Sequence, residues 1–112
     1  MTLWKMISSV EWLEIGGFPL GIGLASMANY TDIGLTLQPG EMLVLMSDGL
    51  VEAMNDQDEI LGFDHVAEIV QAGPLGKSQL MLDHIHQAVA RFVGNTEPHD
   101  DLTVVVITAR TP

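Results

Sequence analysis

Residues 40–53 read GEMLVLMSDGLVEA, the most informative segment of the sequence. The run Met42–Met46 is apolar throughout, which is typical of a strand buried in a sheet. Asp48-Gly49 follows after one serine, and Asp-Gly is a favoured pair for a tight corner. Residues 50–54 then favour a short helix. A strand that ends in such a corner holds one carboxylate, that of Asp48, at the edge of the sheet.

A second set of carboxylates precedes the last apolar run of the chain. Asp100 and Asp101 come directly before residues 102–109, which predict a strand. Carboxylates at two strand ends can converge on one hard cation, because such ions prefer oxygen ligands. The plain alternatives are a turn residue for Asp48 and an exposed loop acid for Asp100. The sequence therefore predicts a candidate cation site and leaves catalytic activity open.

Composition narrows the class of protein. A chain of 112 residues has room for a single domain. Its net charge of −11 repels phosphate backbones and anionic lipid, so we expect no nucleic acid and no membrane as partner, and cations or basic protein segments fit better. The sequence has no cysteine, which fits a reducing compartment, and its apolar runs are far shorter than the roughly 20 residues that span a bilayer. These features predict a cytoplasmic protein.

Two β-prone runs at the start of the chain predict a hairpin. Residues 2–6 and 10–14 flank a pair of serines that suits the turn. Trp4 and Trp12 are expected to pack together on one face of this hairpin.

A second hairpin is expected in the middle of the chain. Residues 30–37 alternate between apolar and polar side chains, as a strand does. Residues 38–41 read QPGE and suit a type II turn, since Pro and Gly occupy its central positions. The turn is expected to return the chain into the buried strand that ends at the Asp-Gly corner.

Two helices are expected between that corner and the last strand. The first is capped by Asp64 and stopped by Gly73-Pro74, and the second begins near Ser78 and ends at Gly94. Both carry an apolar stripe at helical spacing: Phe63, Val66, Ile69 and Val70 on the first, and Leu82, Ile85, Val89, Phe92 and Val93 on the second. The order of elements predicts an α+β fold, a mainly antiparallel sheet with two helices packed on one face.

The histidines do not suggest a metal site of their own. His84 and His86 lie two positions apart on the second helix, which places them on different faces, so we expect surface residues. His99 lies in a polar stretch beside Asp100 and is expected to be solvated.

Several short motifs also occur together and in order: FPLGI at 18–22, LQPGE at 37–41, SDGLVEA at 47–53, LGF at 61–63 and DDLTVVV at 100–106. Together they resemble the C-terminal half of a SpoIIE-like phosphatase domain. Such domains belong to the metal-dependent (PPM, type 2C) serine/threonine phosphatases of bacteria. The resemblance extends over nearly the whole chain, from the first hairpin onward.

This resemblance implies a sandwich of two antiparallel sheets with a pair of Mn²⁺ or Mg²⁺ ions at one edge, where water is activated to attack a phosphoserine or phosphothreonine. By position, it implies Asp48 and Asp100 as metal ligands. Gly49 would let the backbone approach the ions, and Asp101 would support the ligands without binding metal. The metal-activated water is the nucleophile in this family, so no residue is assigned as a catalytic nucleophile.

One departure from the family pattern is large. The family's N-terminal segment of the Asp-x-x-Gly-His type, which supplies further aspartates, has no counterpart in this sequence. We therefore expect residues 1–112 to form one partial domain, with the N-terminal half absent and Mn²⁺ or Mg²⁺ bound weakly. A sheet without its partner layer exposes apolar surface and strand edges, so a homodimer is expected.

The sequence leaves two functions open. One is a phosphatase acting on a phosphoprotein in bacterial signalling, inactive alone and completed by a second chain or a separate N-terminal half. The other is a non-catalytic module that binds a sigma-factor regulator or a second copy of itself. If the chain is a segment of a longer enzyme, the phosphatase function belongs to the longer protein.

Overall fold

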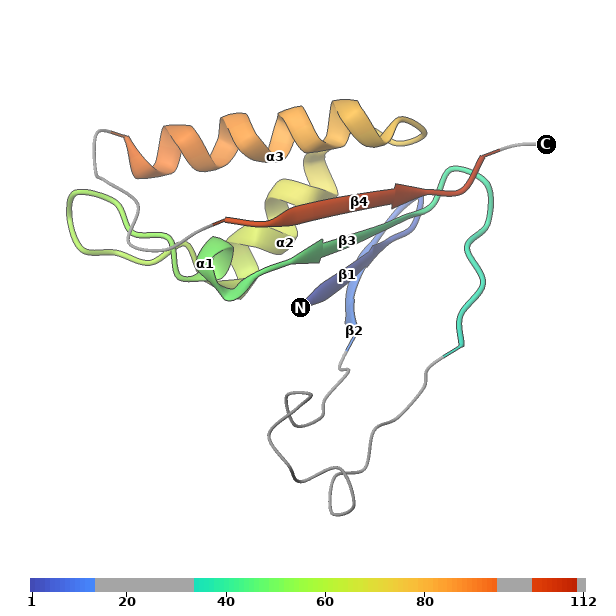
Figure 1. The fold of residues 1–112 in the computed structure, drawn as a ribbon, viewed down its shortest axis with the longest axis horizontal. Helices are drawn as coiled ribbons and strands as arrows, with labels where there is room; N and C mark the ends of the chain where they lie inside the picture. Colours follow the sequence, from blue (N-terminus) through green and yellow to red (C-terminus); the bar gives the residue numbers. More distant parts are fainter. Residues whose placement is uncertain (14–33, 95–101, 111–112) are drawn as a thin grey trace, which may run out of the picture.

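The chain builds one antiparallel sheet with helices on one of its faces (Figure 1). The structure is a computed structural model, and it describes residues 1–13, 34–94 and 102–110. The described elements are, in chain order, β1 (Thr2–Lys5), β2 (Val10–Leu13), β3 (Met42–Met46), α1 (Asp48–Val51), α2 (Gly62–Ala72), α3 (Ser78–Val93) and β4 (Val104–Thr108). This arrangement confirms the predicted α+β class with helices on one side of the sheet.

Strand β3 lies inside the sheet, whose order is β2-β1-β3-β4, and all neighbouring strands are antiparallel. Val44 is paired with Leu3 of β1 on one side and with Val106 of β4 on the other. Because side chains alternate along a strand, Met42, Val44 and Met46 share one face of β3, and all three are buried. The apolar run Met42–Met46 is thus a central strand.

The core lies between this face of the sheet and the helices. Helix α2 packs against β1 and β2, α3 packs against β4, and the two helices pack against each other. The buried apolar residues are Leu3, Met42, Val44, Met46, Leu50, Val51, Leu61, Val66, Ile69, Val70, Met81, Ile85 and Val89. The predicted stripes of both helices therefore supply core residues, to which the structure adds Met81, a fully buried residue outside those stripes.

The first hairpin is confirmed, and its two tryptophans need a correction. Strands β1 and β2 pair antiparallel, with Leu3 opposite Trp12 and Trp4 opposite Glu11. Directly opposed residues share a face, so Trp4 and Trp12 lie on opposite faces of the sheet. Trp12 instead contacts Phe63 of α2 edge to face, with ring centroids 5.3 Å apart.

For the second expected hairpin, the predicted turn is confirmed and the predicted strand pairing is wrong. The Glu41 N–H donates to the Gln38 carbonyl at 2.9 Å, and Gly40 has a φ of +90°, as the third position of a type II turn requires. Residues 30–33 lie outside the described residues, and residues 34–37 form no strand. The reason is that β1 and β4 already occupy both edges of β3.

Element boundaries shift by a few residues from the sequence expectation. Helix α1 begins at Asp48, so this residue lies in the first helical turn, and the residue capping α2 is Leu61 in place of Asp64. Helix α3 begins at Ser78 and ends before Gly94, whose φ is +63°, as predicted. Within the described ranges, no helix is long and apolar enough to span a bilayer.

The buried side chain of Lys5 links the sheet to α2 by a hydrogen bond. The Lys5 side chain is only 2% exposed, on the helix face of β1, and its Nζ donates to the Gln71 carbonyl at 2.9 Å. Gln71 lies in the last turn of α2, where helix carbonyls carry partial negative charge. Burial disfavours the charged form and lowers the pKa of Lys5 from its ordinary value of 10.5.

The lowered pKa of Lys5 predicts a pH dependence of stability. Between the folded and unfolded pKa values the unfolded chain binds more protons, so the free energy of unfolding should rise as pH rises toward 10.5. Relative to Lys5→Met, we expect the wild type to gain stability over this interval, by at most about 1.4 kcal/mol per pH unit. Chemical unfolding from about pH 8 upward measures it.

The matched control is Lys77→Met, because Lys77 is exposed. The difference between wild type and Lys77→Met is the baseline against which the Lys5→Met difference is compared at each pH. A Lys5 difference that is flat or falls as pH rises would contradict the assignment.

Candidate functional site

The Asp-Gly corner lies where β3 passes into α1. Ser47 joins them in an extended conformation, with φ −77° and ψ 163°, and Asp48 opens the helix. The carboxylate of Asp48 is exposed, whereas Gly49 is buried, and Leu50 and Val51 are only 1% and 3% exposed. The corner therefore anchors its backbone in the core and presents one acid to solvent.

Ser47 also ties this corner to the start of β4. The Ser47 N–H donates to the Thr103 carbonyl at 2.9 Å, and the Thr103 N–H donates to Ser47 Oγ at 3.0 Å. These two hydrogen bonds thus join the end of β3 to the start of β4, at one end of the strands. Neither residue had been singled out in the sequence, because this contact joins positions 56 residues apart and leaves no local pattern.

The structure describes two of the four predicted site residues. Asp48 and Gly49 lie at the corner just described, directly after Ser47, which is hydrogen-bonded to Thr103. Asp100 and Asp101 lie outside the described residues, so their approach to Asp48 stays a prediction.

The donor chemistry of this corner suits Mn²⁺ or Mg²⁺. An exposed carboxylate is the oxygen ligand such hard ions prefer, but they take about six oxygen ligands, some from water. Within the described residues, no group of three or more His, Cys, Asp or Glu side chains is arranged to hold a metal ion. Asp48 is therefore suited to be one ligand of a site whose other ligands lie elsewhere.

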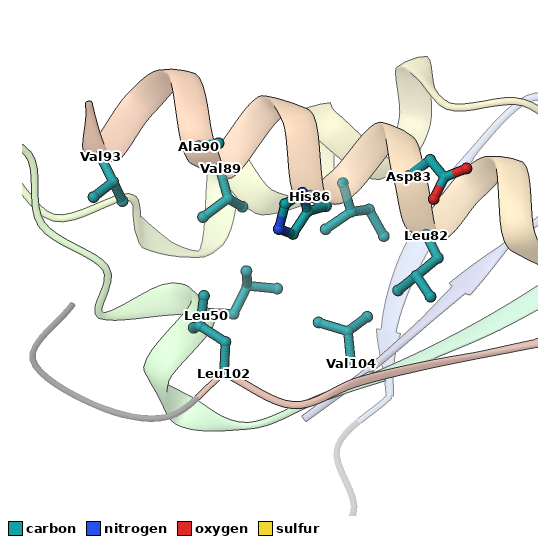
Figure 2. Close-up of a pocket in the computed structure, with 10 residues that line it drawn as sticks. Leu50, Leu82, Asp83, His86, Val89, Ala90, Val93, Leu102 and Val104 are labelled. Atoms are coloured by element: carbon teal, nitrogen blue, oxygen red, sulfur yellow. The ribbon is translucent and has the colours of Figure 1, made fainter. Parts of the chain in front are cut away.

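A groove of about 470 Å³ runs behind the corner, between α3 and the start of β4 (Figure 2). Its lining residues are Leu50, Leu82, Asp83, Ile85, His86, Val89, Ala90, Val93, Leu102 and Val104. Figure 2 shows Leu82 and Val89 of α3 facing Val104 and Leu102 across the groove. Apart from Asp83 and His86, the lining is apolar, so this hollow offers no cluster of ligands or nucleophiles.

The two histidines of α3 do not share a site, as their spacing predicts. His86 lines the groove, whereas His84 Nε2 lies 2.8 Å from the Ile69 carbonyl of α2. His84 is half-buried by that contact, so the expectation of a surface residue is wrong for His84 and holds for His86, which is exposed.

The sheet face opposite the helices is apolar and uncovered by any described helix or strand. Leu45, Val105 and Ile107 lie on it and are 37%, 48% and 46% exposed. Trp4 lies on the same face, and its buried Nε1 has no hydrogen-bond partner among the residues that the structure describes. A face with this composition normally meets another layer.

Comparison with known proteins places these features in a family. The family model described as Stage II sporulation protein E (SpoIIE) matches residues 5–110. Protein IcfG of Synechocystis sp. is 27% identical over 86 residues, which cover 77% of this chain and 13% of that protein.

Two solved structures share the fold. The SiaA-PP2C domain of Pseudomonas aeruginosa matches 96% of this chain and 42% of its own, with a TM-score of 0.73 and 19% identity. The phosphatase domain of the cell fate determinant SpoIIE from Bacillus subtilis, presoaked with Mn, matches 99% of this chain and 48% of its own, with a TM-score of 0.66 and 21% identity. The chain thus spans less than half of each solved domain.

The contact between Ser47 and Thr103 predicts a stability effect. Ser47→Ala removes the acceptor of the Thr103 N–H and should lower the free energy of unfolding by about 0.5–1 kcal/mol, the lower end of the usual range because the contact is exposed. Urea unfolding measures it. Ser8→Ala, in the exposed hairpin turn, is the control and should change stability by less than about 0.5 kcal/mol. Equal stability of the two variants would show that the contact contributes nothing.

Proposed function

Because this chain belongs to the SpoIIE family, we propose that it forms the C-terminal portion of a metal-dependent serine/threonine protein phosphatase domain. The observation that carries the proposal is the corner at the end of β3, where the exposed Asp48 is fastened beside the entry to β4. The corner motif lies inside the matched residues 5–110.

In this proposal Asp48 and Asp100 hold Mn²⁺ or Mg²⁺, which when bound lowers the pKa of a coordinated water and neutralises charge on the phosphoryl group. Asp48 supplies an exposed carboxylate on a backbone held by the buried Leu50 and Val51. Gly49 adds no side chain beside that carboxylate, so its backbone would be able to lie close to a bound ion. Ser47 holds the end of β3 against Thr103, which follows Asp100 and Asp101 closely in the sequence.

The rest of the domain is required for activity in this account. The solved domains are more than twice as long as the parts this chain matches, at 42% and 48% of their length. The uncovered apolar face of the sheet, with Leu45, Val105 and Ile107 exposed, offers a surface for a further layer. We propose that the remaining ligands come with that layer, and that the substrate is a phosphoserine or phosphothreonine protein of bacterial signalling.

The same apolar face supports a second candidate function. A non-catalytic module that binds a regulatory protein, such as a sigma-factor regulator, would use this face and would have no need of Asp48. Since the chain carries a net charge of −11, a partner with a basic surface would associate faster than an acidic one.

Mn²⁺ titration by calorimetry tests the phosphatase proposal. We expect weak binding to the chain, with a dissociation constant of about 10⁻⁴–10⁻³ M, because few carboxylates are available. Asp48→Asn and Asp100→Asn should each abolish it, while the free energy of unfolding changes by less than about 0.5 kcal/mol. The chain alone should release no phosphate from a phosphoserine peptide.

Asp83→Asn is the matched control, since Asp83 is an exposed acid on α3 outside the corner. Binding of Mn²⁺ should be unchanged in this variant. Binding that survives Asp48→Asn, or no binding up to millimolar metal, would contradict the metal-dependent assignment and favour the interaction module.

A further inference from the structure

Among the described strands, β4 is the last of the sheet, and one of its edges pairs with none of them. Its bonds to β3 establish which residues face that edge: the Ser47 N–H donates to the Thr103 carbonyl, and the Ala109 N–H donates to the Glu41 carbonyl. In an antiparallel pair, alternate residues point their backbone groups to the same neighbour. The backbone N–H and C=O groups of Val104, Val106 and Thr108 therefore point away from β3.

This edge lacks the devices that usually prevent strand addition. Natural edge strands carry charges, prolines or bulges, whereas residues 102–109 read LTVVVITA, without charge or proline. All five residues of β4 pair in unbroken register with β3, so no bulge interrupts the strand. The edge is thus a template for another strand.

Apolar surface flanks the edge on both sides. On the uncovered face of the sheet Val105 and Ile107 are 48% and 46% exposed. On the helix face, the groove between α3 and β4 includes Leu102 and Val104 and no residue of β1, β2 or β3, so it lies at the β4 side of the molecule (Figure 2). A strand added here would gain hydrogen bonds and bury apolar side chains on both faces.

We propose that the added strand is β4 of a second copy of this chain, paired antiparallel about a two-fold axis at Val106. In this register Val106 lies opposite its own copy, and Val104 lies opposite Thr108. Every outward N–H and C=O of these three residues then has a partner, and the two four-stranded sheets become one continuous sheet. Shifting the register by two residues in either direction leaves one of the three without its β4 partner.

The second copy suits the edge because the strand is complementary to itself. Across the two-fold axis Val105 meets Ile107 on the uncovered face, a β-branched pair of the kind that stabilises antiparallel sheets. The whole edge from Val104 to Thr108 is used, and no charge is brought into the contact. This isologous pairing closes after two copies.

Charge opposes this association at long range. Each copy carries a net charge of −11, so the copies repel at low ionic strength, while the strand contact itself is uncharged. The dimer should therefore tighten as salt is raised from about 50 to about 500 mM. A contact held by ion pairs would respond in the opposite direction.

This inference goes beyond the proposed function and needs neither bound metal nor catalysis. The backbone edge of β4 is distinct from the face expected to meet the rest of a phosphatase domain, although Val105 and Ile107 border both, and Asp48 takes no part in it. Mn²⁺ binding tests one proposal and oligomeric state tests the other, so either can fail alone.

Sedimentation of the chain at about 10 µM to 1 mM tests the dimer, since a small interface associates in this range. We expect a monomer–dimer equilibrium for the wild type. Val106→Pro removes an N–H that points to the free edge and leaves the bonds to β3 intact, so it should weaken the dimer on the order of tenfold or more. Val106→Thr keeps the N–H and the branched shape, and should remain dimeric.

Disulfide trapping tests the register and applies even if Val106→Pro fails to fold. The chain has no cysteine, so a single introduced thiol is the only one present. Val106→Cys places two thiols opposite each other, with Cα atoms about 5.5 Å apart, and should form a disulfide-linked dimer under mild oxidation. Val104→Cys places its two thiols about 13 Å apart in the same register, too far to link.

Each result decides the proposal. A dimer weakened by Val106→Pro and trapped by Val106→Cys, with Val104→Cys untrapped, supports it. A wild-type monomer at about 1 mM overturns it. So does a dimer that forms equally well with Val106→Pro, or one trapped through Val104→Cys and not through Val106→Cys.

Discussion

The antiparallel pairing of β3 with β4 sets the positions of the other features described above. β3 is a central strand whose buried residues Met42 and Val44 are fully inaccessible to solvent. Because β4 runs antiparallel to β3, the C-terminal end of β3 lies beside the N-terminal end of β4. The Asp-Gly corner, the groove below α3 and the free edge of the sheet all take their positions from this pairing.

Much of the fold could be predicted because its signals are local. The helix stripes, the glycine after α3 and the first hairpin follow from periodicity and turn chemistry within a few residues. The strand expected at residues 30–37 is absent from its described part, residues 34–37. Alternation shows that a segment suits a sheet, but it does not show which strand the segment pairs with. Both sides of β3 are paired with β1 and β4. The facing of Trp4 and Trp12 failed for a related reason, since a one-residue register shift reverses the face.

The candidate site was accessible to sequence reasoning only in part. An apolar run followed by Asp-Gly predicts a carboxylate at a strand end, and Asp48 occupies that position. The contact that holds this corner to Thr103, and the buried Lys5 that reaches Gln71, join residues far apart in the chain. No local sequence pattern marks a serine or a lysine that makes such a distant contact. The contacts can be inferred only when the topology is known, so neither was predicted.

We propose that Asp48 and the entry to β4 form one metal-binding site. An NMR titration with paramagnetic Mn²⁺ at low stoichiometry tests this proposal, because the ion broadens amide signals close to it. The strongest broadening is expected at Gly49 and Leu50 together with Leu102 and Thr103, and it should be lost in Asp48→Asn. Broadening centred on the exposed acidic loop at 55–59, or unchanged in Asp48→Asn, would contradict it.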